Sequence, residues 1–447
     1  MKRLLLLTFF TYTTAHAQVS LSLAQAMDLG VQNRFDVKAG RYRLAEDSQR
    51  VVQAKQAWLP DIKGAGGVQY NTQFQASYIP GGFVSSEPTL VALASKNATV
   101  FGLDLNQAIY NPTNGSDVAL ARNDLALQRE KNRGYVIEIR ERVSSAYLDV
   151  LLRALQRDIA VGDEARYQNY FGLAEGKYNQ GALIETDYQR ARLDYENARL
   201  QTLNATQAYE VALAELKYQV NLPQGTVVRL TDSLTGAFGA VNALALTPGV
   251  ANAVAPGAAA SDLVSDRTEI RQLELTQNAD RLTLQKARRS VLPTVSFTAN
   301  YSQEFLYDNF DYTKGQWWSP FSYIGLRLDL PLTAYYKNRS VVRADAFRVQ
   351  QTDLELQQRT ADIGDEIRRA EANVDNAQNV LEASRRNYDF SKEIYRNQEK
   401  RFRLGAFDYE NLLDTDKSIS AAEQAYVRAA YDYLVAELKY ERATGRL

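Results

Sequence analysis

The sequence predicts a mixed α/β membrane protein built from a duplicated helix–strand–strand–helix unit. Three observations support this fold class: an internal repeat, two very long segments without proline, and short segments in which every second residue is apolar. In both repeats a helical segment reaches a Leu-Pro pair, at 59–60 and at 292–293, and a strand-like segment follows. The pentapeptide Ala-Glu-Leu-Lys-Tyr then occurs near the end of both repeats, at 214–218 and at 436–440.

The first residues have the organisation of a secretory signal peptide. A basic start at Lys2 and Arg3 leads into an apolar run over residues 4–10, and Ala15-His16-Ala17 forms a small-x-small cleavage site. The apolar run is too short to cross a bilayer as a helix, and a retained anchor is the alternative. We therefore expect residues 1–17 to be cleaved after export across the inner membrane.

Histidine and cysteine are almost absent from the sequence. The single histidine, His16, lies inside the predicted signal peptide, and the chain contains no cysteine. The mature chain would therefore lack the residues needed for Ser-His-Asp or Cys-His catalysis, disulfides, a soft zinc site or a lipid anchor on cysteine. We expect no enzymatic activity, metal or cofactor, although a carboxylate-based hydrolase remains chemically open. Because 52 Lys and Arg balance 53 Asp and Glu without a basic block, we expect no nucleic-acid partner.

Two long segments, 113–222 and 332–447, contain no proline. Each holds a stretch of roughly 65 helix-prone residues, which at about 1.5 Å per residue would form a rod about 100 Å long. Apolar and small residues recur there in steps of four and three, as in the series Ile363, Ile367 and Ala370, which is the heptad spacing of coiled coils. An ordinary helical bundle core is the alternative, but the length of the segments favours extended coiled coils.

The apolar period changes from seven to two in the segments between the helices. Apolar side chains occupy alternate positions, as in Val295, Phe297, Ala299 and Tyr301, and the intervening residues are polar. Such alternation is typical of a half-buried strand, either in a soluble sheet or in a transmembrane barrel that is apolar outside and polar inside. Export and a strand length of roughly 10–15 residues favour the barrel, because tilted strands of about that length cross membranes.

Aromatic residues gather around the second predicted pair of strands. Asp308, Asn309, Asp311 and Lys314 are interleaved with them, which argues against a buried core cluster. We interpret the aromatics as a girdle at one membrane interface. They are Phe305, Tyr307, Phe310, Tyr312, Trp317, Trp318 and Phe321.

We identify four strands per chain, arranged as two hairpins, and four strands cannot close a barrel. Open strand edges in lipid would leave backbone groups unpaired, at a cost of several kcal/mol each. Several copies must therefore share one barrel, and two, three or four copies would give eight, twelve or sixteen strands. The strand count alone leaves this choice open.

The boundaries of the predicted elements follow from the changes of period and from the Gly and Pro positions. The first repeat covers 18–222, with a helix over 19–58, strands over 61–78 and 98–110, and a helical hairpin over 114–221 that turns near residue 181. The second covers 261–447, with a helix over 264–291, strands over 293–305 and 318–331, and a helical hairpin over 335–444 that turns near residue 405. The intervening segment 223–260 is expected to be an equatorial linker or a flexible tether.

In this order the motifs resemble those of the TolC family of outer-membrane efflux and secretion channels, over essentially the whole mature chain. Residues 21–26, Leu-Ser-Leu-Ala-Gln-Ala, resemble the opening of that family's first helix. Segments 34–37 and 267–270 resemble its N-P-[DE]-[ILV] element without the proline, and 59–60 and 292–293 match its helix-to-strand transition. Each motif alone is weak evidence for the resemblance, whereas the duplicated set in the same order is strong evidence.

The resemblance implies a homotrimer whose 12-stranded barrel lies in the outer membrane and continues as a helical coiled-coil barrel about 100 Å long in the periplasm. It implies a passive exit duct of a tripartite efflux or type I secretion system. The partners would be other copies of the chain, a periplasmic adaptor (membrane fusion protein), an inner-membrane transporter and outer-membrane lipid. A soluble periplasmic coiled-coil adaptor is the alternative interpretation.

The resemblance also assigns roles at the two helix-hairpin turns, where glycine supplies the left-handed conformation that reverses the chain. The family's periplasmic tip, which contacts the adaptor, matches Gly181, Ala182, Leu183, Gly405, Ala406 and Phe407.

Just past the second turn the family carries acidic rings where the duct narrows. The matching residues here are Asn411 and Asp414, with Asp416 close behind, and solvated helix surface is the alternative. Such rings would attract cations. The family's latch between hairpins matches Asp187 and Phe402, while Phe407 replaces its basic member. We therefore expect closure to rely on packing of the two phenylalanines.

Overall fold

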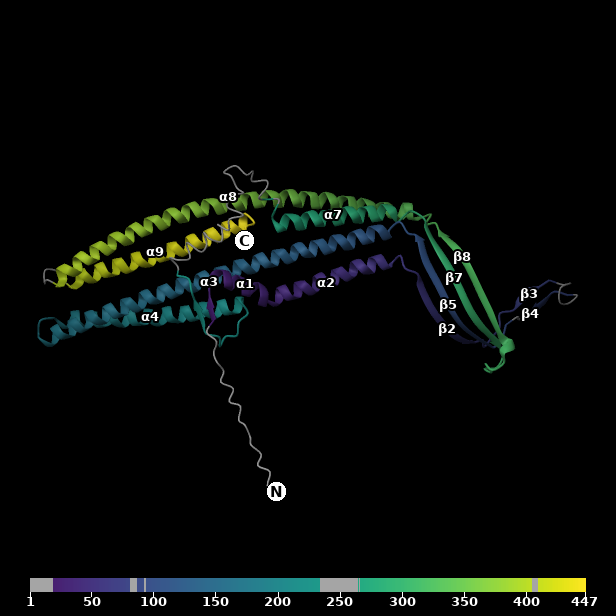
Figure 1. The fold of residues 1–447 in the computed structure, drawn as a ribbon, viewed down its shortest axis with the longest axis horizontal. Coiled ribbons are helices and arrows are strands. Elements are labelled where there is room, and N and C mark those ends of the chain that lie inside the picture. Colours follow the sequence, from purple (N-terminus) through teal and green to yellow (C-terminus); the bar gives the residue numbers. More distant parts are fainter. Residues whose placement is uncertain (1–18, 81–86, 92–93, 234–263, 265, 404–408) are drawn as a thin grey trace, which may run out of the picture. The chain divides into compact units, whose positions relative to one another are not determined.

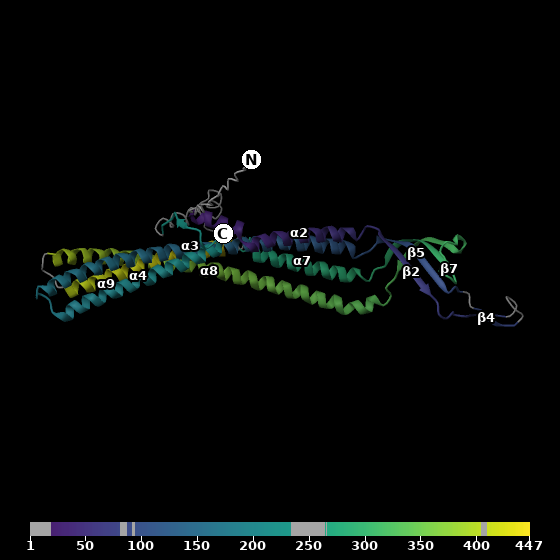
Figure 2. The same cartoon turned by 90° about the horizontal axis from the view of Figure 1, so that it is seen from below.

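Figures 1 and 2 show the computed structural model, which describes residues 19–80, 87–91, 94–233, 264, 266–403 and 409–447. The chain divides into two compact units. The sheet unit comprises residues 43–128 and 273–355, and the helical unit comprises the described parts of 1–42, 129–272 and 356–447. Each unit takes segments from both sequence repeats, so neither repeat is a domain of its own.

The sheet unit contains a four-stranded antiparallel sheet in the order β2-β5-β7-β8 (Figure 1). Its strands are β2 (Asp61–Tyr70), β5 (Asn97–Tyr110), β7 (Thr294–Tyr307) and β8 (Trp318–Asp329). The two strands of each repeat are adjacent, and β5 and β7 join the two repeats. Among the described residues, β2 and β8 each pair on one side only.

The strand register separates apolar and polar side chains onto opposite faces of this sheet. One cross-strand row on the apolar face contains Ile62, Leu105, Ala299 and Ile324. The neighbouring row on the polar face contains Lys63, Asp104, Asn300 and Tyr323. The apolar face is open within the chain, since Ile324 is 79% and Leu326 73% exposed. The alternation in the sequence therefore gives the sheet one apolar face and one polar face that extend across all four strands.

The first strand is shorter than the sequence predicted, because the predicted strand over 61–78 is divided. Its second part is β3 (Ser77–Ile79), which pairs with β4 (Thr89–Val91) in a separate hairpin. Asn71 marks the division: its main-chain N–H donates to the Lys96 carbonyl, and its side-chain amide donates to the Ser95 carbonyl. These bonds end the pairing of β2 with β5.

β2 is rich in glycine, with Gly64, Gly66 and Gly67 among its ten residues. Phe101 of β5 is the register partner of Gly66, and its ring lies over that glycine. A Cβ at residue 66 would be 2.8 Å from Phe101 Cδ1. The phenylalanine ring thus covers the backbone of β2 at Gly66, where the strand has no side chain of its own.

Most other described residues are helical. The helices are α1 (Leu23–Asn33), α2 (Phe35–Gln56), α3 (Asn114–Asn179), α4 (Glu185–Gln219), α7 (Thr268–Arg289), α8 (Ala334–Arg403) and α9 (Tyr409–Ala443). α3 and α4 lie along one another, as do α8 and α9 in the helical unit (Figures 1 and 2). Of the helices that the structure describes, none combines the length and apolar character needed to cross a membrane.

The single helix predicted over 19–58 is interrupted. Residues 19–21 form β1, which pairs in parallel with β6 (Val228–Leu230). Ser22 then caps α1 by accepting a hydrogen bond from the Gln25 N–H, and the Gln25 side chain bonds back to the Ser22 N–H. At the other end of α1 the backbone of Arg34 is extended, so the chain leaves the helix before α2 begins.

The core of the helical unit lies where α1, α3, α4 and α9 pack together. Tyr147 of α3 is fully buried, and its hydroxyl lies 3.0 Å from the Leu21 carbonyl oxygen and 2.9 Å from Asp232 Oδ2. This hydroxyl ties α3 to the ends of both β1 and β6. The apolar core around it includes Val143, Leu148, Leu152, Leu216 and Leu434.

Gly30 of α1 packs directly on this core, because a Cβ there would lie 2.8 Å from Val143 Cγ2. Val143 is fully buried and β-branched, so it cannot swing aside. We expect Gly30→Ala to lower the stability by about 1–3 kcal/mol, the usual cost of overpacking a core. A lower thermal midpoint in circular dichroism would report it. Gly172→Ala is the matched control, since a Cβ at this α3 residue meets nothing within 4 Å, and equal midpoints for both variants would contradict the analysis.

Candidate functional sites

The first predicted tip is the turn between α3 and α4. Gly181 has a left-handed backbone with φ of 73°. The Ala182 N–H donates to the Lys177 carbonyl and the Gly181 N–H to the Tyr178 carbonyl, both at 2.9 Å. These are the two bonds of a Schellman turn, which favours glycine at its left-handed position. Ala182 is exposed and Leu183 half-buried, so the turn presents a small, mostly apolar surface.

Stacked aromatic side chains brace this tip. Tyr178 stacks on Tyr188 with ring centroids 4.9 Å apart, and Phe171 stacks on Tyr188 and Tyr195 at 5.7 and 5.9 Å. These residues were not among those predicted from the sequence. The sequence pattern that could have identified them is heptad spacing. Residues 171 and 178 on α3 are seven positions apart and so share one helix face, as do residues 188 and 195 on α4.

The second predicted tip, with Gly405, Ala406 and Phe407, lies outside the described residues, as does the side chain of Phe402. Asp187, the predicted latch acid, is half-buried in the first turn of α4. The positive end of the helix dipole favours a carboxylate at that position. Its role in a latch stays a prediction.

The three predicted gate residues on α9 fall on different faces of the helix. Asn411 and Asp414 are exposed, whereas Asp416 is fully buried, with its Oδ1 3.0 Å from Arg166 Nε of α3. The prediction that Asp416 lines the pore is therefore wrong, because its carboxylate is enclosed by α3 and neutralised there. Burial raises the pKa of Asp416, and the charge of Arg166 opposes this rise.

Asp416 and Arg166 belong to a small polar cluster, which we call the Arg166 cluster and define as Asp163, Arg166, Asp416 and Ser420. Arg166 also forms an ion pair with Asp163 on its own helix. The Ser420 hydroxyl of α9 donates to Asp163 Oδ2 at 2.7 Å. The cluster therefore joins the first hairpin, α3–α4, to the second hairpin, α8–α9, through charged hydrogen bonds.

The predicted aromatic girdle lies where β7 ends and β8 begins. Phe305 and Trp318 are register partners on the apolar face, with ring centroids 5.3 Å apart. The other close ring pairs are Phe305–Tyr312 at 4.9 Å, Tyr307–Trp317 at 4.9 Å and Tyr70–Phe310 at 5.9 Å. A concentrated aromatic cluster therefore covers one end of the apolar face.

Two members of the predicted girdle need correction. Phe305 is fully buried within the chain, so it forms the centre of the cluster rather than an exposed anchor. Phe321 is the register partner of Ser302 on the polar face. It points away from Trp318 because the two residues are an odd number of positions apart along β8.

Two arginines occupy equivalent positions in the repeats, where the sequence resembled the N-P-[DE]-[ILV] element. Arg34 pairs with Asp36 at 2.8 Å, and Arg267 pairs with Glu269 at 2.9 Å. Each arginine also reaches the last helix of its own repeat: Arg34 donates to Gln219 Oε1, and Arg267 donates to the Arg442 and Ala443 carbonyls.

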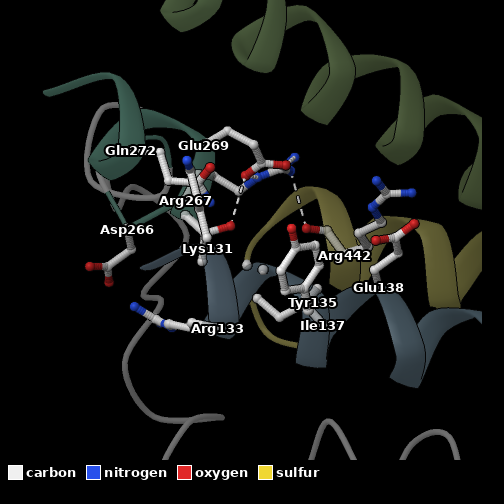
Figure 3. Close-up of a pocket in the computed structure, with 13 residues that line it drawn as sticks. Lys131, Arg133, Tyr135, Ile137, Glu138, Asp266, Arg267, Glu269, Gln272 and Arg442 are labelled. Atoms are coloured by element: carbon white, nitrogen blue, oxygen red, sulfur yellow. Dashed lines mark hydrogen bonds and ion pairs between the residues drawn. The ribbon is translucent and has the colours of Figure 1, made fainter. Parts of the chain in front are cut away.

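Arg267 lies beside a cavity of about 340 Å³ in the helical unit (Figure 3). Figure 3 shows its guanidinium between the Glu269 carboxylate and the end of α9 at Arg442. The arginine thus satisfies C-terminal helix carbonyls that would otherwise lack donors. From the sequence this element was recognisable only by resemblance, whereas the structure gives the arginine a physical role.

Burial and ion pairing act in opposite directions on two glutamates of this unit. Burial disfavours the charge of Glu269, but hydrogen bonds from Arg267 and the charges of Arg267 and Arg359 outweigh it and lower the pKa to about 2. Burial raises the pKa of Glu441 to about 7, with Glu437 contributing and Arg446 opposing. The Glu269 contribution to stability is therefore lost as the pH falls from about 4.5 towards 2, whereas that of Glu441 is lost as the pH rises through 7.

We expect Glu269→Gln to lower the thermal midpoint strongly at pH 7, because it leaves the buried Arg267 without its closest carboxylate. The difference from the unsubstituted protein should shrink at pH 3, where the unfolded chain takes up a proton at residue 269. Circular dichroism melts at the two pH values check this. Glu382→Gln, which removes an exposed partner of Arg386, is the control and should leave the midpoints alike. A pH-independent deficit for Glu269→Gln would refute the assigned pKa.

The part of the chain that the structure describes contains no group of three or more side chains suited to hold a metal ion. What it brings together is a sheet with one apolar face, long helical hairpins and a glycine turn at a tip. These features define a class of outer-membrane channel proteins rather than a class of enzymes.

The chain belongs to the outer membrane efflux protein family, whose model matches residues 27–220 and 259–446. Members of this family are transport channels and not enzymes, and the chain is an outer-membrane channel with a periplasmic extension. The resemblance to the TolC family is thereby confirmed, together with the fold class of four antiparallel strands and long helices per chain.

Individual relatives are distant but extend over nearly the whole chain. The outer membrane efflux protein BepC of Brucella suis biovar 1 is 23% identical over 446 residues, covering 98% of this chain and 88% of BepC. The probable outer membrane lipoprotein SilC of Salmonella typhimurium is 20% identical over 430 residues, covering 96% and 86%. The crystal structure of CusC has the same fold, with a TM-score of 0.74 and 16% identity over 94% of this chain and 91% of CusC.

Proposed function

We propose that this chain forms a homotrimeric exit duct that conducts substrate passively from an inner-membrane transporter and a periplasmic adaptor to the exterior. The observation that carries the proposal is the segregation of apolar and polar side chains across all four strands. The apolar face meets lipid, and the polar face lines a water-filled interior.

Among the described residues, β2 and β8 have no strand partner on their outer edges, so these edges require neighbouring copies. In hydrocarbon each unpaired backbone group costs several kcal/mol, so the edges cannot stay open. Three copies of a four-stranded sheet make a 12-stranded barrel in which β8 of one copy pairs with β2 of the next. Two copies would also supply enough strands, but the family resemblance favours three.

An exposed apolar stripe on α4 supports contact between copies in the helical region as well. Its members are Leu193, Leu200, Leu203, Val211 and Tyr218, each 57 to 62% exposed. Residues 193 and 200, like 211 and 218, are one heptad apart, so the stripe suits packing against another helix. The partner we propose is a second copy of the chain, whose own long helices can run alongside α4.

The tip of each hairpin is the proposed adaptor contact. The residues are Gly181, Ala182, Leu183, Gly405, Ala406 and Phe407. Close to the second tip, the exposed Asn411 and Asp414 would repeat three times around the duct axis and line its narrowest part. A carboxylate ring there favours cations.

Cysteine pairs test the shared barrel, because the chain has no cysteine of its own. Ala65→Cys on β2 is combined with one cysteine on β8, scanned through positions 321, 323, 325 and 327 on the same face. At the correct register we expect disulfide-linked dimers and trimers on a non-reducing gel after extraction of outer membranes.

The matched control is Asp104→Cys with Asn300→Cys, which are register partners on adjacent strands of one chain. This pair should cross-link within the monomer and give no larger band. If all four β2–β8 pairs remain monomeric while the control reacts, copies do not share a sheet, and the proposed barrel fails.

The cleaved signal and the absence of a lipid anchor are part of the proposal. The 447 residues contain no cysteine to carry a lipid, although SilC is described as a probable lipoprotein. Mass spectrometry of protein from outer membranes should find an unmodified chain that begins at Gln18. A mature chain with an attached lipid or with residues 1–17 retained would contradict this.

A further inference from the structure

The orientation of α9 about its own axis decides which side chains of its first turns face the duct. Asn411 and Asp414 lie on one side of this helix and are exposed. At about 100° per residue, Asp416 lies roughly 160° around the helix from Asp414. Leu412, Leu413 and Asp416, each no more than 1% exposed, share the opposite, buried side.

Apolar packing alone specifies this orientation poorly. The burial of Leu412 and Leu413 orients this side of α9 inward, but their dispersion contacts are less directional than an ion pair or a hydrogen bond. The Arg166–Asp416 ion pair is directional: the Arg166 Nε–H donates to Asp416 Oδ1 at 3.0 Å. Ser420, one turn further along the same side of α9, adds a second directional bond to Asp163 at 2.7 Å.

Two further contacts join the hairpins at this level, and the first is the ion pair of Lys417 on α9 with Asp194 on α4 at 3.6 Å. The hydroxyls of Tyr170 on α3 and Tyr395 on α8 are 2.9 Å apart. Both helices of the second hairpin are therefore held to α3 close to the tip. These contacts do not involve Phe402 or Phe407, the two residues whose packing was predicted from the sequence to secure closure.

We propose that Arg166 and Asp416 are positioning residues for the gate: their ion pair, in which Asp416 is buried, fixes the rotation of α9, so that Asp414 and Asn411 point at the duct axis. This inference rests on the proposed trimeric duct. Within the pair, Asp416 is enclosed and so touches no substrate, and Arg166 contacts it from α3. The effect of the pair on conduction passes entirely through the residues on the opposite side of α9.

The direction in which Arg166→Gln changes the ion selectivity distinguishes this positioning role from a direct electrostatic effect. Arg166→Gln removes a positive charge, so simple charge counting predicts a stronger cation preference. The positioning role predicts the opposite, because α9 rotates and the Asp414 carboxylates leave the axis. Asp416→Asn should also weaken the preference, since it removes the carboxylate through which Arg166 holds α9 and leaves Arg166 paired only with Asp163 of its own helix.

The experiment uses full-length protein reconstituted in planar bilayers, with the potassium-over-chloride permeability ratio as the readout. We expect Arg166→Gln and Asp416→Asn each to lower the ratio at least about twofold, as Asp414→Asn does directly. The double variant Arg166→Gln/Asp416→Asn should return towards the original ratio, because an amide pair restores a hydrogen bond without a buried charge. Arg166→Lys should be intermediate, and Arg199→Gln, which breaks an exposed pair with Glu196, should have no effect.

A second readout does not depend on selectivity. In an Asp414→Cys background, copies in one trimer should form disulfides rapidly if residue 414 faces the axis. Adding Arg166→Gln should slow this reaction, and adding Arg199→Gln should not. Thermal melts of each variant identify any that fail to fold, and in that case Arg166→Lys and the double variant carry the test.

The outcomes distinguish the two proposals. If the unsubstituted protein forms no trimeric channel, the proposed function fails. If it forms one, but Arg166→Gln leaves both the permeability ratio and the Asp414→Cys cross-linking unchanged, the positioning role is refuted. A raised ratio in Arg166→Gln with unchanged cross-linking would show a direct electrostatic effect and would also refute it.

Discussion

The structure depends on one constraint, which is that backbone N–H and C=O groups in hydrocarbon have to find partners. A helix satisfies them internally, whereas a sheet satisfies them only where strands pair. The chain supplies four strands with an open edge at each end of the sheet, so the constraint reaches beyond a single copy. Assembly with neighbouring copies is therefore a condition of membrane residence rather than an addition to a finished fold.

The duplicated sequence solves the same local problem twice with different groups. Arg34 and Arg267 both pair with an acid two residues later and with the last helix of their repeat. Arg34 contacts a side-chain amide, while Arg267 is almost fully buried and contacts main-chain carbonyls. The arginine of the second repeat is consequently the more buried of the two. Its partner carboxylate, Glu269, has a pKa far below its ordinary value.

Most of the fold could be predicted because it follows from local periodicity. Alternation gave the four strands, heptads gave the long helices, and Gly181 gave the turn. The interruptions were missed because they depend on side-chain bonds to distant or non-periodic positions, such as those of Asn71 with Ser95. Asp416 was misplaced for the same reason, since its partner Arg166 is 250 residues away and an acid near a turn carries no mark of burial.

The glycines of β2 affect the order of events during biogenesis. A strand with Gly64, Gly66 and Gly67 has little tendency to stay extended, and Phe101 shields it from one neighbour only. Among the described residues its outer edge has no strand partner within the chain, and an adjoining copy supplies one on docking, so completion of its hydrogen bonding and encounter between copies are a single step. The rate of maturation should then scale with the density of newly exported chains in the envelope, as expected for a reaction of higher than first order.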